Sequence, residues 1–187
     1  MLDLPFVSIA PQVNEDFDEQ TDAELVVKEL ALRKVNKVIQ ILKESPQSLP
    51  PLADNAAFWV CGADTLISLD SKILGKPRDR RDAACMLRLC SRRDHQVITA
   101  IALYNGHNKT TDSRSVQSTV SFAPLSDDEI EWYLDSGEWK DAAGSYKIQG
   151  LAACFISGIS GSYSSIVGLP LREFYVMLRD NGYPFGG

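Results

Sequence analysis

Histidine and paired cysteines, the usual ligands of zinc, are scarce in this sequence. Two of the 187 residues are histidine, His95 and His107, and the four cysteines form no Cys-x-x-Cys pair. So little histidine excludes a histidine-built metal site, and a metal held here would take oxygen ligands, which favours Mg²⁺ or Mn²⁺ over Zn²⁺. Free, buried thiols are expected at the four cysteines, Cys61, Cys85, Cys90 and Cys154.

Long apolar runs and an excess of positive charge are also absent. No run approaches the ~20 residues that cross a membrane, and the start of the chain, Met1–Pro5, lacks the basic segment of a signal peptide. We therefore expect a soluble, cytoplasmic protein with no membrane partner. The 19 basic and 25 acidic residues give a net charge of −6. This charge argues against a nucleic-acid partner, because nonspecific binding needs basic residues against the phosphates. A small anionic ligand would need local lysines or a metal.

Capping signals and apolar periodicity predict the helices. The length and the apolar content of 44% suit one globular domain with its own core. A capping box at Thr21–Glu24, with Thr21 as the N-cap, predicts a long amphipathic helix that ends near Lys43. A second capping box at Ser126–Glu129 predicts a shorter helix. Further helices are expected after Pro77 and after Gly168.

Runs of apolar or alternating residues predict five strands. Two of them, His95–Tyr104 and Ser113–Ala123, flank a turn signal at 105–108 and should form an antiparallel hairpin with one wet face. A mobile loop is expected at 158–165, where glycine and serine are frequent. The remaining predicted strands are 5–10, 58–61 and 151–156.

The stretch 58–77 carries the clearest chemical signal. Its strand-length apolar run leads directly into Asp64, and about a dozen residues later Lys76 stands between a glycine and a proline. A carboxylate at the end of a buried strand is costly unless something pairs with it. A fixed anion near a fixed cation on tight backbone suits a site for a metal and a phosphate. The other interpretation is an ordinary turn after a strand.

Two charged residues before this stretch also stand out. Lys34 falls near the middle of the apolar arc of the first predicted helix when residues are placed about 100° apart. Either its stem lies along the edge of the core, or it points into a cleft and meets an anion. Glu15 belongs to an acidic loop at 12–19, which is either a solvated turn or the source of a cation ligand.

Several segments, in this order and spacing, resemble the Maf family of nucleoside triphosphate pyrophosphatases across nearly the whole chain. The resemblance implies an α/β fold with an elongated mixed sheet, flanking helices and a central cleft, often as a homodimer. It also implies metal-dependent hydrolysis of a nucleoside triphosphate to the monophosphate and pyrophosphate. The segment Ala143–Gln149 looks like the subgroup that acts on dTTP and UTP, and modified pyrimidine nucleotides are further candidate substrates. The matching segments are Gly62–Thr65, Gly75–Pro77, Ser91–Thr99, Phe122–Ile130, Ala143–Gly150 and Val167–Leu171.

The resemblance implies roles for individual residues. Asp64 would ligate the metal, which implies Mg²⁺ or Mn²⁺, or orient the attacking water, and Glu15 would hold the metal. Lys34 and Lys76 match family lysines of the catalytic site, and Lys76 would bind the phosphates. This chemistry fits, because phosphate transfer needs positioned cations more than a covalent nucleophile. The residues implied to bind the substrate are Thr65 and Gln149.

The sequence departs from the family pattern in three places. The family opens with a strand and a Ser-x-x-Arg segment that cradles phosphate, so the resemblance implies a single domain, 1–187, that lacks both and leaves a sheet edge unprotected. Arg92 stands where the family usually has glycine, and Asn14 stands where aspartate is common. The alternative function is therefore a catalytically impaired nucleotide-binding or regulatory protein linked to septum formation or cell division. A purely structural subunit is a third alternative.

Overall fold

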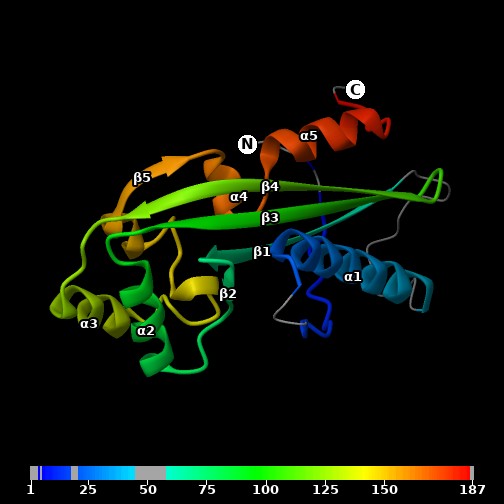
Figure 1. Ribbon diagram of the computed structural model, residues 1–187. Helices are drawn as coiled ribbons and strands as arrows, with labels where there is room; N and C mark the ends of the chain where they lie inside the picture. Colours follow the sequence, from blue (N-terminus) through cyan, green and yellow to red (C-terminus); the bar gives the residue numbers. More distant parts are fainter. Residues whose placement is uncertain (1–3, 5, 18–20, 45–57, 186–187) are drawn as a thin grey trace.

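A five-stranded sheet forms the centre of the computed structural model, which describes residues 4, 6–17, 21–44 and 58–185. The strands are β1 (Trp59–Leu69), β2 (Lys72–Leu74), β3 (Asp94–Asn105), β4 (Thr110–Phe122) and β5 (Ile156–Ser160), in the order β2-β1-β3-β4-β5. The expected α/β fold with an elongated sheet is confirmed (Figure 1). Every neighbouring pair is antiparallel, however, whereas a mixed sheet was expected. Tight turns join β1 to β2 and β3 to β4, and such turns can connect antiparallel strands only.

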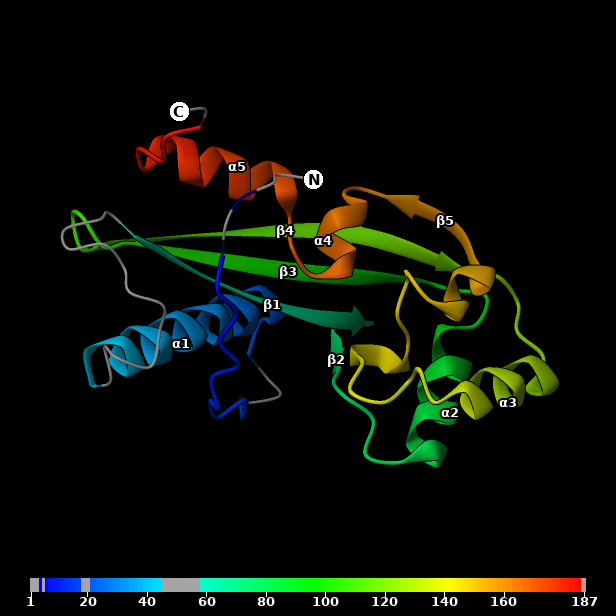
Figure 2. The same cartoon turned by 180° about the vertical axis from the view of Figure 1, so that it is seen from behind.

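Two helices cover opposite faces of the long strands, α1 (Ala23–Glu44) on one face and α5 (Leu171–Asp180) on the other (Figures 1 and 2). The alternation of side chains along β3 explains how one strand serves both helices. Ala100 and Ala102 pack in the cluster under α1, while Ile101 and Leu103 pack with Met177 of α5. β3 is therefore buried on both faces where the helices lie.

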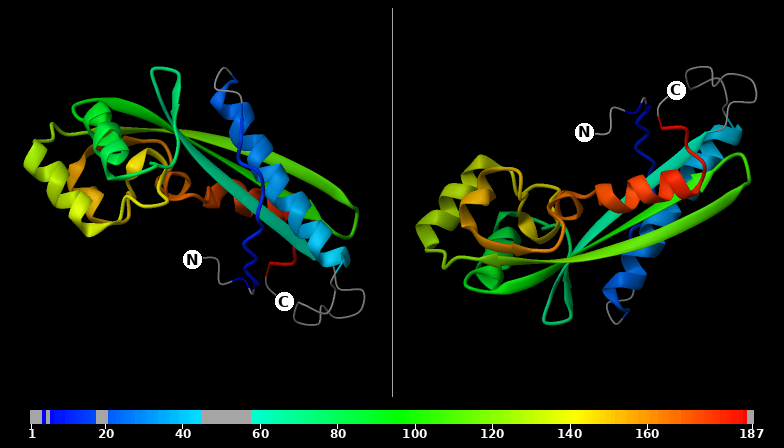
Figure 3. Two further views of the ribbon diagram at one scale, coloured as in Figure 1. Left: turned by 90° about the horizontal axis from the view of Figure 1, so that it is seen from below. Right: turned by 90° about the horizontal axis from the view of Figure 1, so that it is seen from above.

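A second core lies at the other end of the sheet, between the strands and the helices α2 (Arg80–Cys90) and α3 (Asp127–Ser136) (Figure 3). Two short 3₁₀ helices, η2 (Ala143–Ser145) and η3 (Leu151–Phe155), and the helix α4 (Tyr163–Val167) complete this end. Within the described residues, no helix is long and apolar enough to cross a membrane.

The two predicted capping boxes have different outcomes. At α3 the box is present in both directions, since the N–H of Glu129 donates to Ser126 Oγ and Glu129 Oε2 accepts from the N–H of Ser126. At α1 the predicted N-cap Thr21 is wrong. Asp22 Oδ1 accepts from the N–H of Glu24 at 2.9 Å, and the carboxylate of Glu24 pairs with Lys28 instead of reaching back.

Three strand predictions need correction. The 58–61 strand does not stop before Asp64 but continues through it, because β1 remains paired with β3 over that length. The 151–156 segment is mostly η3, since Ala152 and Phe155 are buried three residues apart while Leu151 is exposed, which is a helical rather than an alternating spacing. Residues 6–10 form no strand, and Phe6 is exposed.

The structure also tests the expectations for the loop 158–165, the cysteines and the hairpin. The predicted loop 158–165 contains the end of β5 and the start of α4. The four cysteines are free, as expected, but only Cys90 is buried. The expected antiparallel hairpin of β3 and β4 is confirmed, but the expectation of one wet face is wrong for β3, which is buried on both faces.

Candidate active site

Four charged side chains from four segments meet beside β1. Asp64 lies in the middle of that strand, opposite Ala100 of β3. Lys34 comes from α1, Glu15 from the irregular segment before α1, and Lys76 from the loop after β2. We call these four side chains the charged cluster.

A close approach of α1 to β1 brings the first pair of the cluster together. A Cβ atom on Gly62 would lie 2.9 Å from Val35 and 3.0 Å from the carbonyl oxygen of Ala31, so a glycine allows the helix to rest directly on the strand. Two residues further along β1, Asp64 points to the same face and accepts a hydrogen bond from Lys34 Nζ. The unusual place of Lys34 on the apolar arc is thereby explained, because the lysine meets an anion there.

Glu15 is held between the two lysines. Its carboxylate oxygens lie 3.0 Å from Lys76 Nζ and 3.7 Å from Lys34 Nζ. The hydrogen bond from Lys76 lowers the pKa of Glu15. Burial raises the pKa of Asp64, whose side chain is only 11% exposed, although Lys34 acts in the opposite direction. The cluster thus contains two carboxylates of different basicity and two lysines.

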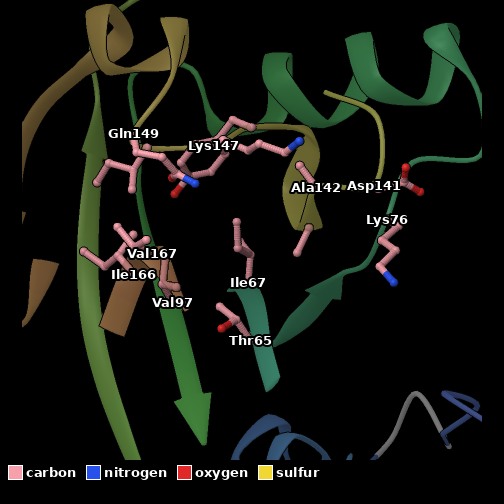
Figure 4. Close-up of a pocket in the computed structure, with 13 residues that line it drawn as sticks. Thr65, Ile67, Lys76, Val97, Asp141, Ala142, Lys147, Gln149, Ile166 and Val167 are labelled. Carbon is pink, nitrogen blue, oxygen red and sulfur yellow. The ribbon is translucent and has the colours of Figure 1, made fainter. Parts of the chain in front are cut away.

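A pocket of about 250 Å³ lies on the opposite face of β1 and reaches the cluster at Lys76. Figure 4 shows Lys76 and Gln149 on different sides of this pocket, with Thr65 on the strand below them. The three predicted residues Thr65, Lys76 and Gln149 therefore line one cavity. Lys76 is the member that belongs to both the pocket and the charged cluster.

The hydroxyl of Thr65 is fixed as an acceptor toward this pocket. Thr99 Oγ1 donates its single proton to the carbonyl oxygen of Ser165 at 2.6 Å. The 2.9 Å contact between Thr65 Oγ1 and Thr99 Oγ1 must then take its proton from Thr65. Thr65 has no second proton to donate, so a ligand group that meets its oxygen has to be a donor.

The segment Ala143–Gln149 forms a wall of the pocket, and a glycine lies where it crosses β1. Gly144 has a φ of +62°, and a Cβ atom there would lie 2.6 Å from Ile67. Its N–H donates to the carbonyl oxygen of Gly75 at 3.0 Å, which ties this wall to the Lys76 loop. The motif was recognised in the sequence, but its contact with the lysine loop was not predicted.

An aromatic group of His95, Phe122 and Tyr146, here called the aromatic wall, lies behind this segment. Tyr146 lines the pocket, and its hydroxyl lies 2.6 Å from Nε2 of His95. Burial lowers the pKa of His95 to about 4, so the ring is neutral at pH 7. Neither residue was singled out for this role from the sequence, because a buried histidine and tyrosine look like ordinary core residues there.

The carboxylates of the charged cluster suit a hard divalent cation. Among the described residues no group of three or more His, Cys, Asp or Glu side chains could hold a metal by itself. Glu15 and Asp64 both approach Lys34, so two carboxylates converge on one place. Mg²⁺ commonly binds in proteins through one or two carboxylates, with waters and substrate phosphates as the other ligands. The donor set therefore fits Mg²⁺ or Mn²⁺ bound together with a phosphate ligand.

Comparison with known proteins places the chain among Maf-like sequences. The family described as Maf-like protein matches residues 1–181. A protein named dTTP/UTP pyrophosphatase from Symbiobacterium thermophilum is 40% identical over 181 residues, which cover 97% of this chain and 86% of the relative. Proteins of the same name from Shewanella denitrificans and Aromatoleum aromaticum are 42% and 47% identical, over 92% and 86% of this chain and 81% and 73% of their own lengths.

Proposed function

Because this chain belongs to the Maf family, we propose that it hydrolyses dTTP and UTP to their monophosphates and pyrophosphate. The observation that carries the proposal is the meeting of Glu15, Lys34, Asp64 and Lys76 next to a pocket that Lys76 also lines. Relatives named dTTP/UTP pyrophosphatase support the choice of substrates.

Asp64 is the group that orients the attacking water. The carboxylate accepts a proton from the water as the water oxygen attacks the α-phosphorus, and the bond from that phosphorus to the bridging oxygen breaks to release pyrophosphate. Without a metal, burial raises the pKa of Asp64 while Lys34 acts in the opposite direction, and a carboxylate is a common general base. Lys34 holds Asp64 in place, and Lys76 offers its ammonium group to the phosphate oxygens.

Glu15 and Asp64 are the residues that would hold a divalent metal. When bound, such a metal neutralises negative charge on the phosphate oxygens. The lysines already balance these carboxylates in the charged cluster, so the dication is expected to bind together with the anionic nucleotide rather than before it.

The polar residues of the pocket fit the remaining parts of a pyrimidine nucleotide. Thr65 lies on β1 between Lys76 and Gln149 and can only accept, so we assign it to the 3′-hydroxyl of the sugar. Gln149 offers both an amide donor and an amide acceptor, which is the pair that the O4 and N3–H of thymine or uracil require. The order from phosphate to sugar to base then follows the pocket.

The test is product analysis with a panel of nucleoside triphosphates in Mg²⁺ or Mn²⁺. We expect dTTP and UTP to give the monophosphate and pyrophosphate in equal amounts, and chelation of the metal to stop the reaction. A diphosphate and inorganic phosphate would place the cleavage at another bond and contradict the proposal. Tight binding of dTTP without any cleavage would instead support the non-catalytic, nucleotide-binding alternative.

A further inference from the structure

We propose that Arg33 is a positioning residue that holds Glu15 in the active site, an inference that rests on the metal-binding role proposed for Glu15. Glu15 lies in the segment 6–17, which contains no helix or strand. A carboxylate that must ligate a metal cannot move freely, because ligand affinity depends on a fixed geometry. Something outside this segment has to fix it.

The guanidinium of Arg33 donates hydrogen bonds to the backbone on both sides of Glu15. Its Nη1 donates to the carbonyl oxygen of Asn14 at 3.0 Å and to that of Asp16 at 3.2 Å. The turn between these two residues is closed by Asn14 Oδ1, which lies 2.7 Å from the N–H of Asp16. Among hydrogen bonds between described residues, those from Arg33 alone join the backbone of 6–17 to the rest of the protein.

An arginine is required at this position because the side chain performs two tasks at once. Its Nε and Nη2 donate to Glu29 Oε1, one turn earlier on α1, at 3.1 and 2.6 Å. That ion pair is largely exposed and contributes little stability by itself, but it aims the remaining nitrogen at the segment. A lysine has one nitrogen on a flexible stem and cannot hold Glu29 and both carbonyl groups in a fixed fork.

Consecutive residues of α1 therefore hold Glu15 at two levels. Arg33 holds the backbone around it, and Lys34 lies 3.7 Å from its carboxylate while bonding to Asp64. Rigid helix geometry links the position of Glu15 to that of Asp64. Loss of Arg33 leaves the carboxylate attached through lysine side chains only, which lowers its local concentration at the metal.

The test compares Arg33→Gln and Arg33→Lys with Lys37→Gln, a matched change one turn further along α1, where the lysine ammonium donates a hydrogen bond to Gln40 and, among the described residues, none to the segment 6–17. We expect both Arg33 variants to lose about tenfold in kcat/KM and in Mn²⁺ affinity, the latter measured by electron paramagnetic resonance with a non-hydrolysable dTTP analogue. Lys37→Gln should behave as wild type. Wild-type values in Arg33→Gln, or full rescue by lysine, would overturn the proposal.

A double-mutant cycle separates positioning from a general structural effect. Adding Arg33→Gln to Glu15→Gln should cause no further loss, because the residue acts through Glu15. Independent, multiplying losses would overturn the proposal. Hydrogen exchange of residues 14–16 should rise in Arg33→Gln whether or not the protein is active, so an inactive wild type would refute the proposed function without deciding about Arg33. Unchanged exchange would refute the role of Arg33 itself.

Discussion

Asp64 and His95 are buried titratable residues on neighbouring strands of one sheet, but their side chains have different kinds of partner. Asp64, on β1, has a cation beside it in Lys34, whereas His95, on β3, has a neutral tyrosine hydroxyl beside it. Burial of a charge is costly, so a buried group either gains a counter-charge or becomes neutral. Asp64 in the charged cluster gains a counter-charge, whereas His95 in the aromatic wall is neutral. Burial alone therefore does not mark a catalytic group, but the kind of partner does.

Among the variants predicted here to change the protein, Asp64→Asn in the charged cluster is expected to have the largest effect, and this effect is on the reaction rate. Asparagine keeps the shape of the side chain but cannot accept a proton from water, so pyrophosphate release from dTTP should fall about 10³-fold. The matched control is Asp70→Asn, in the turn directly after the same strand. Asp70 pairs with Arg93 at 2.6 Å, and its positive φ of 50° is one that asparagine tolerates. Comparable losses in both variants would contradict the assignment.

The corresponding prediction for the aromatic wall rests on His95 and concerns the free energy of unfolding rather than the reaction rate. Its pKa of about 4 in the folded protein lies below the ordinary value of 6.5, so between these values the unfolded chain binds more protons than the folded one. The free energy of unfolding must then fall as the pH falls, by about 3 kcal/mol over this window. Urea unfolding at pH 7 and pH 4 should show this loss in the wild type.

The variant His95→Gln isolates that effect, because glutamine can still bond to the hydroxyl of Tyr146 but does not titrate. The pH dependence of the variant should be shallower than that of the wild type by the same amount, whatever its absolute stability. Equal slopes in His95→Gln and wild type would show that folding does not lower the pKa of His95.

The sequence predicted the residues of the charged cluster better than those of the aromatic wall. Lys34 was conspicuous because a lysine on an apolar arc needs a partner, and Asp64 because a carboxylate interrupts an apolar run. The contact between them was not predictable from spacing, since they are 30 residues apart. His95 and Tyr146, 51 residues apart, lie in segments that match the family, but their contact was not predicted, because a neutral buried pair has the same pattern as ordinary core residues.

The fold could be predicted where periodicity or capping chemistry was distinctive. The hairpin of β3 and β4 and the capping box of α3 are of this kind. The segment 151–156 was predicted wrongly because a short apolar run does not distinguish a strand from a helical turn. Its conformation as η3 depends on which residues meet the distant core, and that is a property of the tertiary structure.

Thr65 lies where the charged cluster and the pocket meet, since it follows Asp64 in β1 but faces the pocket. Thr65→Val keeps the volume and removes the acceptor, so kcat/KM for dTTP should fall about tenfold, the value of one hydrogen bond. Thr65→Ser should keep most of the activity. The loss should disappear for the triphosphate of 2′,3′-dideoxythymidine, which lacks the hydroxyl in question. An equal loss for both nucleotides would assign Thr65 to another part of the substrate.

Arg92 lies outside the charged cluster and the aromatic wall. Its substitution is expected to have the smallest effect, and only on the free energy of unfolding. Its φ of +62° is unfavourable for a residue with a Cβ atom, and its position is the one where the resemblance expected glycine. Arg92→Gly should therefore raise the free energy of unfolding by about 1 kcal/mol, measured in urea, without changing kcat. The backbone N–H still donates to the carbonyl oxygen of Ala123, so no contact is lost. Arg92→Ala removes the same exposed side chain but keeps Cβ, and a similar gain in that variant would show that the backbone strain is not the cause.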